Sequence, residues 1–422
     1  MTNHTRPEFL QGVRDFGASL REDHGRLLWT TILVSLAACG TSADAKVALN
    51  VPTIDTLPGG IVHVVNTGPT AWPDTSGWRW VPTVTISPPD GSPGELSDIS
   101  TLAIGDDGTV YAMQNKPAVI KVFGPDGSYL GNLGKEGGGP GEYHVGFLGI
   151  RGDTLGVQDP NSSRFTLFLK DGTFLKAVPS PCCYFWPRIT IDSTGLAWIP
   201  GSGRNNQASW YRIRLDGSVV DTIPMPAQED FRKLKNWTVT VKRGGNAMSM
   251  IMMAPLQPGN FFEPRIDGMI VSGHSASYRF AILRGATDTA RLFEASAPEL
   301  PISDAMRDTL FENATQHPDA AIQKAMRESA NKDDIPHTWL PWTHLSLDRA
   351  GRLWVALPGD AGEVTRLQVF DRNGILLGDV PPPSRKMFKS AAWGRDRLAV
   401  ADEDDDGRPV IRVFRLETGT AK

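Results

Sequence analysis

The chain has 422 residues, of which 40% are hydrophobic and 21% are charged. Its 43 glycines and 32 prolines make up about 18% of the residues, against an average near 12%, which indicates many turns and excludes a helical bundle. The formal net charge of −4 argues against a protein that binds nucleic acid through a basic surface.

The N-terminal region has the pattern of an export signal. Residues 27–38 are an uncharged, largely apolar run after Arg26. As a helix this run would be about 18 Å long, too short for a hydrocarbon core of roughly 30 Å, but it fits the hydrophobic region of a secretory signal. Small residues then precede Cys39, which resembles a bacterial lipobox. We expect residues 1–38 to be a lipoprotein signal peptide, Cys39 to carry the lipid and residues 39–58 to be a flexible linker. The alternatives are an ordinary signal peptide or a buried helix.

From residue 59 onward the sequence repeats a unit of two β-hairpins, clearest over residues 102–133. The turns of the first hairpins align at Gly108, Asp153, Gly195, Gly268, Gly351 and Asp396. Three of the five intervals are near 45 residues, and the other two are longer. A period of about 40–50 residues with four strands per unit is typical of a β-propeller blade. We predict an all-β fold over residues 59–417, a six-bladed β-propeller of four-stranded antiparallel blades, with residues 418–422 as a tail.

The last repeat has no room for its fourth strand before the C-terminus. Residues 80–86, upstream of the first blade, are predicted to supply that strand and to close the ring, which removes the last open sheet edge. The two long intervals are predicted to hold insertions. One, near residues 228–260, is rich in methionine and is predicted to be an added hairpin or strand excursion. The other, near residues 302–334, is predicted to be a small helical insertion with Pro318 in the first turn of its second helix.

Several segments carry a resemblance to a known family. They are GGGPGEY at 137–143, LDRAGRLWV at 347–355, QVFDRNG at 368–374 and GGIVHVVNTGP at 59–69. With these segments the chain resembles the bacterial six-bladed β-propeller lipoproteins related to NHL-repeat proteins, over nearly its whole mature length. The resemblance implies the architecture and says almost nothing about chemistry, because this fold serves many functions.

Two local motifs invite a ligand-binding interpretation. The glycine run at 137–141 lacks the Gly-Lys-Ser/Thr of a phosphate loop, so a tight crossover between blades is favoured. Asp402, Asp404 and Asp406 before Gly407 match the first half of a calcium loop, but Val413 stands where a bidentate Glu is needed. A calcium-binding hairpin is therefore the weaker hypothesis here, and a solvated acidic turn the stronger one.

Cys182 and Cys183 are the remaining thiols once Cys39 is lipidated. In an oxidising compartment two cysteines tend to pair, but adjacent Cα atoms about 3.8 Å apart are closer than a relaxed disulfide allows. A strained vicinal disulfide and two small, partly buried thiols are the two interpretations.

Ligands of β-propellers usually bind at the mouth of the central channel, beside the segments that lead into each innermost strand. Here those segments carry acidic, basic and aromatic side chains, which suit a polar organic ligand or a sugar. The candidates are Glu142, His144, Trp186, Arg188, Glu263, Arg265, Trp342, His344 and Lys389, with Trp393. Alternatively, these side chains satisfy one another around a water-filled channel.

No catalytic set is recognisable, because the histidines lack the spacing of a zinc site and no nucleophile motif is present. Trp198 and Trp354 occupy a repeated position and are predicted to pack between sheets. We expect a monomeric binding or interaction module, anchored to the bacterial membrane through its lipid only, without a cofactor. Its partner would be an envelope protein, a small polar ligand or a glycan, and not a nucleic acid.

Two alternative functions stay open. One is a calcium-dependent hydrolase or lyase similar to the six-bladed lactonases, for which only Glu142 and Glu263 can be placed as ligands. The other is an envelope glycan-binding protein that uses the aromatic residues at the channel mouth.

Overall fold

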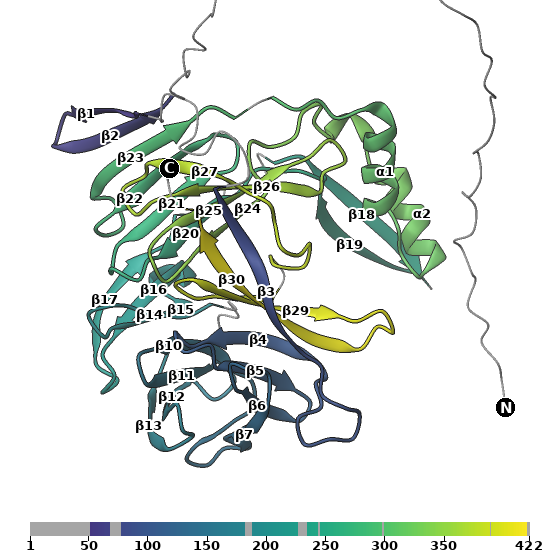
Figure 1. Cartoon of the computed structure of the whole chain (residues 1–422). Coiled ribbons are helices and arrows are strands. Elements are labelled where there is room, and N and C mark those ends of the chain that lie inside the picture. The colour runs from purple at the N-terminus through teal and green to yellow at the C-terminus, as the bar shows by residue number, and fades with distance from the viewer. Residues whose placement is uncertain are drawn as a thin grey trace, which may run out of the picture. The chain divides into compact units, whose positions relative to one another are not determined.

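The computed structural model describes residues 51–67, 77–181, 188–226, 234–243, 245–297, 299–388 and 390–419. Strands dominate these residues, and they assemble into six antiparallel units of four strands each. The units are the blades of a six-bladed β-propeller (Figure 1). The predicted fold class is confirmed.

Each blade is built from an innermost to an outermost strand. The first three blades are β4 (Ile99–Ile104), β5 (Val110–Asn115), β6 (Ala118–Phe123) and β7 (Tyr129–Leu133); β10 (Phe147–Arg151), β11 (Thr154–Asp159), β12 (Arg164–Leu169) and β13 (Phe174–Pro179); and β14 (Thr190–Ile191), β15 (Ala197–Ser202), β16 (Ala208–Ile213) and β17 (Val219–Pro224). The fourth and fifth are β20 (Asn260–Pro264), β21 (Ile270–His274), β22 (Arg279–Leu283) and β23 (Thr289–Ala295); and β24 (His344–Leu347), β25 (Leu353–Pro358), β26 (Val364–Phe370) and β27 (Leu376–Val380). The sixth consists of β28 (Ala391–Trp393), β29 (Arg397–Glu403), β30 (Pro409–Thr418) and β3 (Trp78–Ile86).

A repeated glycine turn explains why the sequence forms these hairpins. Between β4 and β5, Gly108 has a φ of 95° and its N–H donates to the Gly105 carbonyl at 3.0 Å. Gly351 repeats this geometry between β24 and β25, with a φ of 80°. Glycine adopts such a φ without the steric cost that a side chain would bring.

The position three residues after each turn faces the core, as predicted. Its occupants in five blades are no more than 1% exposed, and they are Tyr111, Trp198, Val271, Trp354 and Ala399. The core therefore lies between neighbouring blades, where each sheet covers the face of the next.

The ring is closed by the predicted N-terminal strand. β3 pairs antiparallel with β30, so that the sixth blade is made from both ends of the chain. The pairing runs to Thr418, the first residue of the predicted tail, which lies opposite Trp78. Trp80 of β3 packs with its ring centroid 5.2 Å from Trp354 and 6.0 Å from Trp393.

The predicted linker needs a correction at its C-terminal end. Residues 53–57 form β1 (Thr53–Leu57), which makes a hairpin with β2 (Ile61–Asn66). β2 then runs parallel to β23, so the hairpin extends the fourth blade to six strands (Figure 1). Asn66 joins this blade to the fifth, because its side-chain amide donates to the Gly374 carbonyl at 3.0 Å and its Oδ1 accepts from Leu376 N–H at 2.8 Å.

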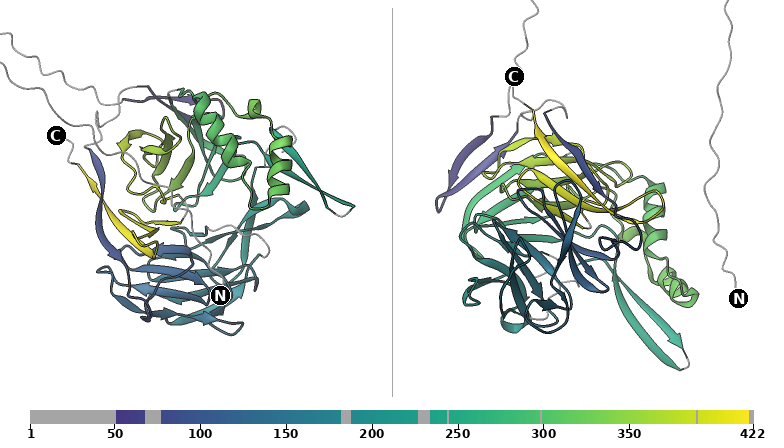
Figure 2. Two further views of the ribbon diagram at one scale, coloured as in Figure 1. Left: turned by 90° about the vertical axis from the view of Figure 1, so that its right-hand side faces the viewer. Right: turned by 60° about the horizontal axis from the view of Figure 1, so that its bottom comes forward.

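Both predicted insertions are present. The first is the hairpin of β18 (Asn236–Arg243) and β19 (Asn246–Met253), and the second contains α1 (Asp304–Ala314) and α2 (Ala320–Ser329). α2 lies against the hairpin (Figure 2). Val239, Val241 and Met326 form a buried cluster between them. Pro318 precedes the helix rather than forming its first turn, because Asp319 is the N-cap and accepts the N–H groups of Ala321 and Ile322.

Candidate functional site

The six innermost strands surround a narrow channel. Its cavity has a volume of about 150 Å³, room for a few water molecules. Its wall combines aliphatic side chains, such as Leu102, Leu148 and Ile189, with the polar groups of Arg188, Asp348 and Arg349. Among the described lining residues Asp348 is the one acid. The channel itself therefore offers no described cluster of carboxylates that could hold calcium.

A larger cavity, of about 530 Å³, lies beside the end at which the chain enters the innermost strands. We call it the mouth pocket. Three consecutive blades build it, from the end of β17, from β20 and from the segment that leads into β24. Four of the predicted mouth residues line it, namely Arg188, Glu263, Trp342 and His344. Since Arg188 also borders the channel, the two cavities adjoin at this residue.

The charged groups of the mouth pocket differ in their access to water. Arg188 is exposed, and in the part of the chain that the structure describes no hydrogen bond or ion pair holds its guanidinium group. Glu263 is only 6% exposed, so its carboxylate is largely removed from solvent. The positive charge is therefore the one that an incoming ligand meets first.

His344 begins strand β24 and its ring stacks on Phe388, with centroids 4.8 Å apart and planes 19° apart. Partial desolvation, and then the positive charge of Arg188, lower the pKa of His344. At neutral pH its imidazole is therefore uncharged and can accept as well as donate a hydrogen bond.

Trp342 serves the core more than the pocket. It is 5% exposed, its Nε1–H donates to the Ser277 carbonyl at 3.0 Å, and its ring lies 6.0 Å from that of Phe280. The apolar surface of the pocket comes instead from residues that the sequence interpretation missed, Met225, Phe261 and Leu340. Met225 precedes the hairpin insertion and Leu340 follows the helical insertion. The two long intervals between repeats therefore pointed to the part of the chain that supplies this apolar wall.

Glu142 and His144 do not line the mouth pocket. They lie in the crossover from the first to the second blade, where β8 (Lys135–Glu136) and β9 (Glu142–Tyr143) form a short parallel pair. Glu142 accepts the Gly139 N–H at 2.7 Å and lies 3.2 Å from Lys135 Nζ, and these contacts lower its pKa. The glycine run thus forms the predicted blade crossover.

Arg265 requires a correction, because it lies at the opposite end of the innermost strand. β20 ends at Pro264, and Arg265 begins the turn to β21. There it forms an ion pair with Asp267 and donates to the Arg372 carbonyl at 2.8 Å, with only 4% of its surface exposed. It joins the turns of the fourth and fifth blades.

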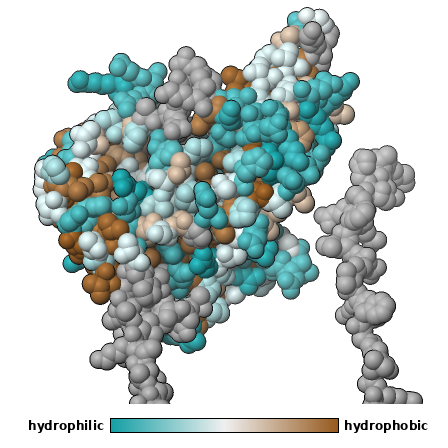
Figure 3. Space-filling view, turned by 90° about the horizontal axis from the view of Figure 1, so that it is seen from above, coloured by the Kyte–Doolittle hydropathy of each residue, from teal (hydrophilic) through white to brown (hydrophobic). Residues whose placement is uncertain are grey.

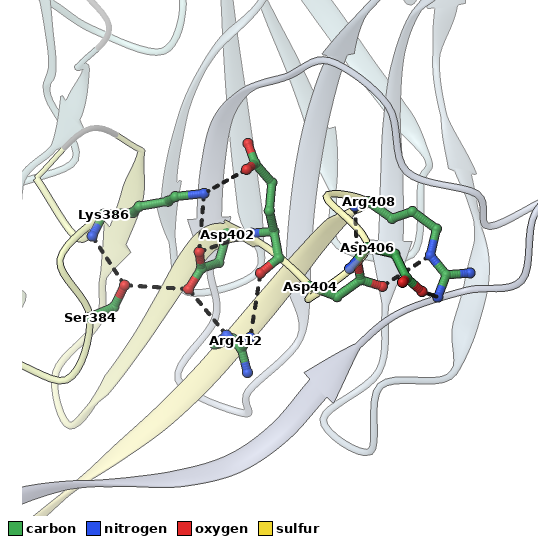
Figure 4. A network of polar contacts seen from close by, with 8 residues as sticks. Ser384, Lys386, Asp402, Asp404, Asp406, Arg408 and Arg412 are labelled. Carbon is green, nitrogen blue, oxygen red and sulfur yellow. Dashed lines mark hydrogen bonds and ion pairs between the residues drawn. The ribbon is translucent and has the colours of Figure 1, made fainter. Parts of the chain in front are cut away.

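The three aspartates of the predicted calcium loop face cations rather than one another (Figure 4). Asp402 lies 3.4 Å from Lys386 Nζ and 3.1 Å from Arg412 Nε. Burial raises the pKa of Asp402, but hydrogen bonds from the Glu403 N–H, Lys386 and Arg412 outweigh burial and lower it. Asp404 and Asp406 are each 3.0 Å from Arg408. This arrangement is an ion-paired hairpin turn, and a calcium-binding hairpin stays the weaker hypothesis.

Several predicted site residues lie outside the described residues, namely Cys39, Cys182, Cys183, Trp186 and Lys389. Within the described ranges, no three His, Cys, Asp or Glu side chains gather as a metal site would require. No helix in those ranges is long and apolar enough to cross a membrane.

Neither a protein-family model nor a curated protein matches the chain. Among solved structures, it is similar to a Bacteroides fragilis protein whose name describes it as exported, at 10% identity and a TM-score of 0.46, over 85% of this chain and 100% of that one. A DUF4221 family member from Bacteroides vulgatus gives 10% and 0.42, over 82% and 100%. Virginiamycin B lyase from Staphylococcus aureus gives 13% and 0.36, over 76% and 96%. No activity is transferred from them to this chain.

Proposed function

We propose that this protein is an exported, lipid-anchored propeller that binds a small polar organic molecule in the mouth pocket and acts as a binding module rather than as an enzyme. The observation that supports it is the convergence of Arg188, Glu263 and His344 from three blades on one cavity of about 530 Å³. Pockets of about 300–1,000 Å³ with apolar walls and a few polar groups are typical of small-molecule sites.

On the face shown in Figure 3, hydrophobic residues occur in small groups between hydrophilic ones. Scattered hydrophobic residues of this kind do not mark a protein interface on that face.

The test is a thermal-shift screen of the protein without its signal sequence, against calcium, zinc, oligosaccharides and small polar organic molecules. A ligand at a hundred times its Kd stabilises a protein by about 2.7 kcal/mol. We expect a small organic molecule to stabilise the protein and a Phe261→Ala, His344→Ala double variant to lose that response. Stabilisation by oligosaccharides alone would support the glycan-binding alternative. Bound calcium whose removal abolishes lactone hydrolysis would overturn the non-enzymatic proposal.

The anchor is tested separately, through Cys39. A Cys39→Ser variant expressed in a bacterium should be recovered in the soluble fraction of the envelope, whereas the parent protein should remain with the membranes. Membrane association that survives the substitution would contradict the lipid anchor and leave ligand binding unaffected.

A further inference from the structure

The mouth pocket lies where the hairpin insertion leaves and rejoins the ring and where the helical insertion rejoins it. Met225 and Gln257 flank the hairpin insertion, and Leu340 follows the helical one. The connections from the third to the fourth blade and from the fourth to the fifth blade are longer than the other connections between blades. The pocket lies at these two neighbouring junctions.

The two insertions hold each other in place although they are far apart in sequence. Trp237 of β18 donates its Nε1–H to Asp334 Oδ2 at 3.1 Å, and its ring lies 6.0 Å from Phe311 of α1. Val239 and Met326 add a buried apolar contact. This packing joins the two insertions, and Met225 and Leu340, which flank them in the sequence, line the pocket.

The polar side of the pocket is asymmetric in charge. Among its described lining residues, the charged or titratable side chains are Arg188, Glu263 and His344. Glu263 on β20 is buried, whereas Arg188, which precedes β14, is exposed and has no described carboxylate partner. A guanidinium group in this position presents several donors to a carboxylate or phosphate.

We propose that the ligand of the mouth pocket is an organic anion with an apolar body, which places its negative group on Arg188 and its body against Met225, Phe261 and Leu340. This inference rests on the proposed function and specifies the ligand class. Among the lining residues that the structure describes, a sugar would find only the Phe261 ring to stack on, because Phe262 and Trp342 are buried.

His344 provides an independent readout of the same event. The charge of Arg188 contributes to the lowered pKa of His344, after desolvation. An anion on Arg188 offsets that charge, so binding raises the pKa of His344 and is accompanied by proton uptake. For the same reason the affinity increases as the pH falls toward 6, where the carboxylate of the ligand is still ionised.

The experiment uses phenylacetate, hexanoate and octanoate as probes, each beside its uncharged amide, with isothermal titration calorimetry at pH 6 and pH 7.5. At least one acid should bind more tightly than its amide, and more tightly at pH 6. Arg188→Gln should weaken binding of that acid by roughly tenfold to a hundredfold and leave the amide unchanged. The matched control is Arg214→Gln, an exposed arginine in the turn between β16 and β17, which should change neither.

A histidine NMR titration completes the test. The His344 signal, identified by its loss in His344→Gln, should titrate at a higher pH when the acid is bound. Amides that bind as well as acids, or an Arg188→Gln variant that binds the acid normally, would overturn the anion inference and leave the proposed pocket function standing. Failure of all three acids would also overturn it, whereas failure of every small molecule in the broader screen would overturn the proposed function itself.

Discussion

At the scale of single residues, the third and fifth blades each have an aspartate, Asp192 and Asp348, that accepts hydrogen bonds both from a turn and from a core tryptophan. Asp192 Oδ1 accepts the N–H groups of Thr194 and Leu196, while its Oδ2 accepts the Trp198 indole N–H at 2.8 Å. Asp348 holds Trp354 in the same way, also at 2.8 Å. Because both indoles are fully buried, water cannot replace the carboxylate. The recurrence of tryptophan three residues after a turn therefore reflects a hydrogen-bonding requirement as well as packing.

Replacing Asp192 by alanine should destabilise the protein by about 2–3 kcal/mol, because a buried indole N–H loses its acceptor. Asp404→Ala is the matched control. Asp404 accepts the turn N–H groups of Asp406 and Arg408, but its turn is exposed and carries no tryptophan, so solvent replaces the lost contacts and the effect is smaller. Urea unfolding of the two variants measures the difference. Equal losses would show that the indole contact contributes little.

At the scale of elements, the hairpins and both insertions could be predicted because their signals are local. Glycine turns and alternating apolar residues identify a hairpin within about a dozen residues. The sequence of residues 61–66 also indicates a strand, but it does not indicate which strand pairs with it. The partner is β23, where Glu294 contacts His63 of β2 from 231 positions away. A parallel pairing of this kind leaves no pattern in either strand. For this reason the sequence places residues 61–66 at the start of the propeller but does not predict that they extend the sheet of the fourth blade.

The junction between β2 and β23 leads to a prediction with a pH dependence. His63 lies 3.2 Å from Asp55 and 3.0 Å from Glu294, and Arg279 lies 2.6 Å from the same glutamate. The hydrogen bond from Arg279 is the main cause that lowers the pKa of Glu294. A lowered pKa in the folded state means that this stabilisation is present above the ordinary glutamate pKa and is lost as the pH falls through the lowered value.

Glu294→Gln should therefore loosen the β1–β2 hairpin at pH 7 by about 0.5–1 kcal/mol, with little effect at pH 3. Protection of the β2 amides from hydrogen exchange, corrected for the intrinsic rate at each pH, measures it. Glu328→Gln on the exposed side of α2 serves as the control. Equal protection of β2 in both variants at pH 7 would contradict a role for this ion pair.

At the scale of the whole molecule, the candidate site could be predicted only in part. The repeat places the lead-in segments, and four of the predicted residues meet in the mouth pocket. Arg265 was misplaced because the innermost strand of its blade is Asn260–Pro264, so Arg265 follows that strand instead of leading into it. The apolar wall was missed because it depends on two insertions that pack together over sequence separations such as the 97 residues between Trp237 and Asp334.

We predict that ring closure makes the six blades one cooperative unit, and a substitution of Trp80 tests this prediction. Each blade contacts only its neighbours, so an open ring would lose order from its ends, whereas a closed ring has no ends. Trp80 lies on the closing strand, is 9% exposed, and packs with Trp354 of the fifth blade and Trp393 of the sixth. Trp80→Ala should cost about 3–5 kcal/mol, as expected for loss of a buried tryptophan.

Which blades lose stability in Trp80→Ala distinguishes an effect of ring closure from the local loss of a packed side chain. If closure couples the ring, Trp80→Ala should lower amide protection in all six blades, including those far from the substitution, and unfolding should remain a single transition. Trp237→Ala provides the contrast, because this tryptophan is 2% exposed but belongs to the paired insertions. It should lower protection in β18, β19 and the two helices while the blades keep theirs. Loss of protection confined to the fifth and sixth blades in Trp80→Ala would show that the blades are stable without closure.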